Sequence, residues 1–118
     1  AMGKAAGSAG RDEHYEQSIT VDGLALDDFV YEEKHPQPEL VKLDIEGGEG
    51  MALAGMRRIL KDARPIFLIE LHGEQAAAQV WEQLTANGYS LHRMRKGYDR
   101  VRTLAELDWK AYVVALPD

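Results

Sequence analysis

The sequence contains no cysteine, only 4 prolines among 118 residues, and no long apolar run. Without cysteine the chain forms no disulfide and offers no thiolate metal ligand and no thiol nucleophile. This usage fits a reducing compartment, so we expect a cytoplasmic location. The longest unbroken apolar run, residues 111–116, has six residues, whereas a helix that crosses a bilayer needs about 20. We therefore expect no membrane partner.

Positive charge is also scarce, because 14 lysines and arginines stand against 20 aspartates and glutamates, a formal net charge of −6. A dedicated nucleic-acid binder concentrates positive charge, so we expect no nucleic-acid partner. Five of the 14 basic residues nevertheless fall within residues 93–102. We interpret this stretch as the solvated loop of a hairpin, and binding of phosphate, RNA or an acidic substrate is the alternative.

From residue 40 onward, short apolar segments alternate with segments in which apolar residues recur at helical spacing. The expected strands cover residues 40–45, 66–71, 89–94 and 112–116, and the expected helices cover residues 49–61 and 74–87. Four consecutive apolar residues open the segment 66–71, which predicts a central strand covered on both faces. The order of elements predicts an α/β layer with an antiparallel final strand.

The region before residue 40 gives weaker signals. Residues 19–21 are compatible with a short strand, and residues 26–33 with a helical turn that has acidic residues at its start. Residues 1–18 are interpreted as a flexible N-terminal segment whose Ala before Met2 indicates the remnant of a cleaved fusion. Residues 19–118 then form the domain.

Three carboxylates and three glycines gather in residues 44–50, where the first predicted strand ends and a helix begins. Active sites of open α/β sheets collect at such strand ends. The segment matches neither the dinucleotide-binding glycine pattern nor the phosphate-binding loop. Glu46 and Glu49 would moreover repel a polyphosphate. The loop therefore favours a cation, a hydroxyl group or a metal as its ligand.

The next predicted strand has a similar end, because Glu70 and His72 are two residues apart, as are Asp44 and Glu46. Residues two apart on a strand share a face, so adjacent parallel strands would bring all four groups into one crevice. Such a crevice would hold a general base, an orienting carboxylate and hard oxygen ligands. In the alternative interpretation, Asp44 caps the next turn, Glu46 and Glu49 are solvated, and His72 is a surface residue.

The other aromatic and histidine side chains carry less information. Trp81 and Trp109 are interpreted as core residues rather than stacking platforms. His14, His35 and His92 have no partners at metal-ligand spacing, so no role is assigned to them.

Two segments of this sequence resemble the FkbM family of S-adenosylmethionine-dependent methyltransferases. They are VKLDIEGGE at residues 41–49, followed by Leu-Ala-Gly at 53–55, and RPIFLIELH at residues 64–72. Upstream, Leu-Asp-Asp-Phe at residues 26–29 is similar to the segment that precedes the first of these strands in the family.

The resemblance implies a partial class I, Rossmann-like methyltransferase sheet, with strands four to seven and two helices. Residues 19–118 would be the C-terminal half of such a domain. It also implies S-adenosylmethionine as cofactor, although the glycine-rich loop that binds it in the family does not occur upstream of residue 40. The first strand would then have an open edge, which predicts a homodimer formed by strand pairing.

By the same resemblance, the reaction is O-methylation of a hydroxyl group on a small molecule or sugar. Asp44 or His72 would be the catalytic base and Glu70 an orienting group, with Glu46, Gly47 and Glu49 close to substrate or cofactor. Two alternatives stay open. One is a non-catalytic binding or interaction module with the same half-fold. The other is a metal-dependent hydrolase in which Asp44, Glu46, Glu70 and His72 surround a divalent ion.

Overall fold

The structure, a computed structural model, describes residues 23–118. The strand expected at residues 19–21, the N-terminal segment 1–18 and His14 lie outside these residues. The described part of the chain forms a five-stranded sheet in the order β1-β2-β5-β3-β4. The strands are β1 (Leu40–Leu43), β2 (Ile66–Glu70), β3 (Tyr89–Arg93), β4 (Arg100–Val101) and β5 (Tyr112–Pro117).

The sheet is mixed, and its last strand lies in its middle. β1 and β2 are parallel, whereas β5 runs antiparallel to both β2 and β3. The antiparallel final strand and the α/β class are therefore confirmed. The two-residue strand β4, which pairs with β3, was not expected, because its short polar sequence gives no strand signal.

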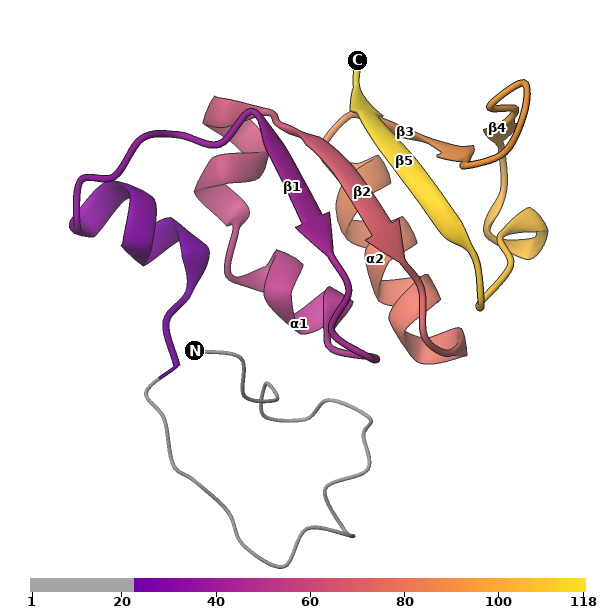
Figure 1. The fold of residues 1–118 in the computed structure, drawn as a ribbon, viewed down its shortest axis with the longest axis horizontal. Coiled ribbons are helices and arrows are strands. Elements are labelled where there is room, and N and C mark those ends of the chain that lie inside the picture. The colour runs from indigo at the N-terminus through magenta and orange to yellow at the C-terminus, as the bar shows by residue number, and fades with distance from the viewer. Residues whose placement is uncertain (1–22) are drawn as a thin grey trace, which may run out of the picture.

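The helices all cover the same face of the sheet (Figure 1). They are α1 (Glu49–Ala54), α2 (Glu74–Ala86) and the π-helical turn η3 (Ile59–Ala63), with the further turns η2 (Asp28–Glu32) and η4 (Leu104–Glu106) outside this layer. Phe67 and Ile69 of β2 face the helices and are 0% and 1% exposed. Ile66, on the opposite face, is 40% exposed. The prediction of a strand covered on both faces is therefore wrong for the described part of the chain, because the helices there pack on one side only.

The helix expected over residues 49–61 is divided into α1 and η3. α1 ends before Gly55. The backbone of Gly55 lies close to Ala25, because a β-carbon added to Gly55 would be 3.1 Å from the β-carbon of Ala25. The helix is therefore interrupted where the chain around residue 25 packs against it. Asp27 then caps the second part, because its two carboxylate oxygens accept hydrogen bonds from the backbone N–H groups of Arg58 at 2.8 Å and Ile59 at 3.0 Å. Helix ends leave such N–H groups without intrahelical partners.

The side chain of Arg64 connects the end of η3 to the end of α2. Its guanidinium donates to the carbonyl oxygens of Leu60 at 3.0 Å, Asn87 at 2.8 Å and Gly88 at 3.1 Å. Trp81 on α2 packs against the core as expected. Trp109 is 41% exposed, so its assignment to the core is wrong; it lies in the loop between η4 and β5. Over residues 23–118, no helix is both long enough and apolar enough to cross a membrane.

Candidate functional site

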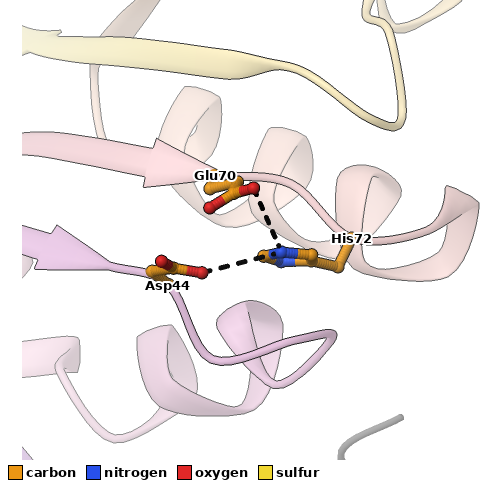
Figure 2. A group of neighbouring side chains, drawn as sticks. All are labelled: Asp44, Glu70 and His72. Atoms are coloured by element: carbon orange, nitrogen blue, oxygen red, sulfur yellow. Dashed lines mark ion pairs between the residues drawn. The ribbon is translucent and has the colours of Figure 1, made fainter. Parts of the chain in front are cut away.

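Parallel pairing of β1 and β2 brings Asp44, Glu70 and His72 together at one end of the sheet (Figure 2). Asp44 follows β1 directly, Glu70 ends β2, and His72 lies two residues further on. The Nε2 atom of His72 is 3.6 Å from Oδ1 of Asp44 and 3.5 Å from Oε1 of Glu70. The predicted convergence of these three groups is therefore confirmed.

Glu49 approaches the same histidine from the opposite side. Its side chain has 0% exposure, and Oε2 lies 3.4 Å from Nδ1 of His72. The same oxygen accepts hydrogen bonds from the backbone N–H groups of Ile45 at 3.1 Å and Gly47 at 3.2 Å. Among residues 23–118, Oε1 of Glu49 and Nδ1 of His72 have no hydrogen-bond partner. The solvated Glu49 of the alternative interpretation is thus contradicted.

Glu46 does not join the cluster, which corrects the expectation that four strand-end groups converge. It is exposed and has a left-handed backbone conformation, with φ 52°. The reason is that β1 ends at Leu43, so the alternation of a strand no longer applies at residue 46. Gly47, with φ 100°, completes this turn and donates its N–H to Glu49. Glycine adopts such a conformation without steric cost.

Tyr112 is a site residue that the sequence reasoning missed. It begins β5 and pairs in register with Glu70. Hydrogen bonding to Glu70 raises the pKa of the Tyr112 hydroxyl, and the charges of Glu70 and Asp44 act in the same direction. The hydroxyl therefore stays protonated and donates toward Glu70. The signal that could have found it is that an antiparallel strand starts where its parallel neighbours end.

His72 lines two cavities. The first, of about 530 Å³, lies between the starts of α1 and α2, and its lining includes Gly47, Gly50, Met51, His72, Gln75 and Gln79. The second, of about 480 Å³, is lined by Glu70, Leu71, His72, Gly73, Trp109 and Lys110. His72 therefore lies between these two cavities.

The charge of the site is strongly negative. Three carboxylates, those of Asp44, Glu49 and Glu70, lie within 3.6 Å of one imidazole ring. Within residues 23–118, no arginine or lysine forms an ion pair with any of the three. One ligand atom from each of Asp44, Glu70 and His72 lies within 4.8 Å of the other two, which suits a metal ion. The site is therefore complementary to a cation.

The basic stretch at residues 93–102 spans the end of β3, the loop that follows it and strand β4, and two of its arginines are paired. Arg93 and Arg95 both contact the carboxylate of Asp99, Arg95 at 3.0 Å. His92 contacts Ser90 at 3.1 Å and the carbonyl oxygen of Tyr98 at 2.9 Å, and the ring of His35 stacks on Phe29. These contacts are local, and none of them reaches the cluster around His72.

Comparison with known proteins identifies one family. The family model described as the methyltransferase FkbM domain matches residues 2–91. This range contains Asp44, Glu49, Glu70 and His72, together with β1, β2 and both α-helices. No curated protein matches the chain, and no solved structure matches it either.

Proposed function

Because the chain belongs to the FkbM methyltransferase family, we propose that it takes part in S-adenosylmethionine-dependent methylation of a hydroxyl group on a small molecule or sugar. The observation that carries this proposal is the convergence of Asp44, Glu70 and His72 at the carboxyl ends of two parallel strands. Ligands of open α/β sheets bind at this end. The reversed strand β5 between β2 and β3 supports the assignment of β1, β2, β3 and β5 to the last four strands of a Rossmann-like methyltransferase.

The charge of the site supports this cofactor. Three carboxylates around His72 form a negative surface that suits a sulfonium cation. When bound, S-adenosylmethionine supplies an electrophilic methyl group: the acceptor oxygen bonds to the methyl carbon, the methyl–sulfur bond breaks with its electron pair left on sulfur, and the hydroxyl proton is released. Residues of the cluster then have two tasks, to orient the hydroxyl and to take its proton.

We propose two groups as acceptors of the hydroxyl proton. With the ring proton of His72 at Nδ1, toward Glu49, the lone pair of Nε2 points between Asp44 and Glu70. Either Nε2 or the carboxylate of Asp44 can accept the proton, while Glu70, which lies beside Tyr112 of β5, orients the acceptor. The separations of 3.4–3.6 Å are longer than hydrogen bonds, as catalytic contacts often are before substrate binds. General base catalysis of this kind contributes about 10²- to 10⁴-fold.

The test is an assay of methyl transfer by this chain and by a version extended upstream to include the family's glycine-rich cofactor loop, with radiolabelled S-adenosylmethionine and a panel of sugars and polyhydroxylated small molecules as acceptors. We expect one class of acceptor to be methylated, and His72→Gln to lower the rate about 10²-fold or more. Glu82→Gln, an exposed charge change on α2, is the matched control and should leave the rate unchanged.

Two other outcomes would contradict the proposal. Binding of the methyl donor without transfer to any acceptor would favour the non-catalytic binding module. Hydrolysis of an ester or amide that requires a divalent ion and no methyl donor would favour the hydrolase.

A further inference from the structure

The structure assigns a binding site for a divalent cation of the Mg²⁺ and Mn²⁺ class to Oδ1 of Asp44, Oε1 of Glu70 and Nε2 of His72. The three side chains point toward one another (Figure 2), and one ligand atom from each lies within 4.8 Å of the ligand atoms of the other two. Ligand atoms about 2.1 Å from one ion are about 3.0 to 3.4 Å apart. The observed separations from Nε2, 3.5 Å and 3.6 Å, exceed this range by only a few tenths of an ångström, and the ligand atoms of Asp44 and Glu70 lie within 4.8 Å of each other.

Glu49 gives a second, independent indication. It is a fully buried carboxylate that faces Nδ1 of His72, and its Oε1 has no hydrogen-bond partner among residues 23–118. Metal-ligating histidines commonly direct their second ring nitrogen at a carboxylate, which fixes the tautomer and raises the basicity of the ligating nitrogen. With the proton of His72 at Nδ1, the Nε2 lone pair is directed at the point between Asp44 and Glu70.

The donor set is compatible with Mn²⁺. Two carboxylate oxygens are hard ligands, the one imidazole nitrogen is a ligand that several divalent metals accept, and the remaining coordination positions are left for water or an acceptor oxygen. Side-chain exposures of 44% for Asp44, 28% for Glu70 and 27% for His72 leave this point accessible from solvent. A cation also offsets the excess negative charge of the three surrounding carboxylates.

The role of the ion in catalysis depends on the proposed methyl transfer, whereas its binding does not. A divalent cation lowers the pKa of a coordinated hydroxyl group. The lone pair of Nε2 of His72 would then be shared with the ion, so this nitrogen would not be available to accept the proton.

The experiment is a titration of the full chain with Mn²⁺ alone, without methyl donor, followed by calorimetry and electron paramagnetic resonance. We expect one Mn²⁺ per chain and a spin-echo modulation from one coordinated imidazole nitrogen. Asp44→Asn and Glu70→Gln should each weaken binding at least tenfold, and His72→Gln should abolish the nitrogen signal. Glu82→Gln should bind Mn²⁺ as tightly as the parent chain does. Thermal unfolding without metal verifies that each variant is folded.

Three results would overturn the inference: no binding at millimolar Mn²⁺, binding without a nitrogen signal, or equal weakening by Glu82→Gln. Methyl transfer that persists in a chelator, together with absent Mn²⁺ binding, would overturn the metal site and leave His72 as the base. Mn²⁺ binding with the expected signal but without methyl transfer would overturn the proposed function alone.

Discussion

Nδ1 of His72 lies 3.4 Å from Oε2 of Glu49, a carboxylate with no exposed surface. The same carboxylate accepts the backbone N–H groups of Ile45 and Gly47, so one buried side chain both shapes the turn after β1 and lies beside the histidine after β2.

Replacement of Glu49 should separate these two tasks. Glu49→Ala removes the acceptor of two backbone N–H groups and leaves a cavity, so we expect the free energy of unfolding to fall by about 2–4 kcal/mol. Glu49→Gln keeps an oxygen for both N–H groups and should be less destabilising, but it should weaken Mn²⁺ binding about 10- to 100-fold. Urea denaturation and Mn²⁺ titration measure the two effects. An unchanged free energy of unfolding in Glu49→Ala would show that Glu49 does not stabilise the turn after β1.

Asp27 should stabilise the start of a helical segment at Arg58, which lies 31 residues later in the sequence. Its carboxylate caps the N–H groups of Arg58 and Ile59, and loss of a capping side chain costs about 1–2 kcal/mol. We expect Asp27→Ala to lower the free energy of unfolding by this amount in urea denaturation. Asp28→Ala changes the charge of the neighbouring, exposed position and should have a smaller effect. Equal effects of the two would argue against the cap.

Gly50 should be intolerant of a side chain, because α1 and α2 are in close contact there. A β-carbon at residue 50 would lie 2.5 Å from the β-carbon of Gln79. We expect Gly50→Ala to destabilise the protein by about 1–3 kcal/mol. Since Gln79→Gly removes the atoms in conflict, the double variant should lose less than the sum of the two single losses. A strictly additive double-mutant cycle would disprove the contact.

The ion pairs of Asp99 should make a small, pH-dependent contribution to stability. Hydrogen bonding to Arg95, with further contributions from Arg93, lowers the pKa of Asp99 below 3.8. A carboxylate whose pKa is lower in the folded state stabilises the fold above its unfolded pKa and loses this effect as the pH falls through the folded value.

We therefore expect Asp99→Asn to be less stable than the parent chain at neutral pH, with a difference that disappears below pH 3.8. Urea denaturation over this pH range measures the difference, and exposure keeps it small. Asp108→Asn, at an exposed position without an ion pair among the described residues, is the control. A difference in the free energy of unfolding that increases as the pH falls would contradict this prediction.

The exposed edge of β1 should promote self-association. Within residues 23–118, β1 pairs only with β2, and Leu40 is 56% exposed. An unpaired apolar edge is a template for another strand, whereas charge on it blocks pairing. We expect sedimentation velocity to show dimers that increase with concentration and that Leu40→Lys suppresses. Leu104→Lys, at a position 41% exposed outside the sheet, should not suppress them. A monomer at every concentration would refute this expectation.

Local patterns predicted the elements well, because β1, β2 and α2 depend on apolar runs and helical spacing within one segment. The meeting of Asp44, Glu70 and His72 also followed from sequence, since parallel neighbouring strands end at the same edge. Glu49 could not be placed in this way. A first-turn acid is usually solvated, and its burial here depends on the turn at residues 46–47 and on α2 packing against α1. The contacts of Asp27 and Tyr112 likewise join segments far apart in sequence.

The position of β5 has a consequence for the order of events during synthesis. β5 is hydrogen bonded on one side to β2 and on the other to β3, and it separates the two. Until residues 112–117 have left the ribosome, β2 and β3 have no shared partner, and the sheet cannot be completed. We expect the nascent chain to carry exposed strand edges throughout that interval, so the emergence of β5, rather than the formation of any helix, sets the moment at which this sheet can form.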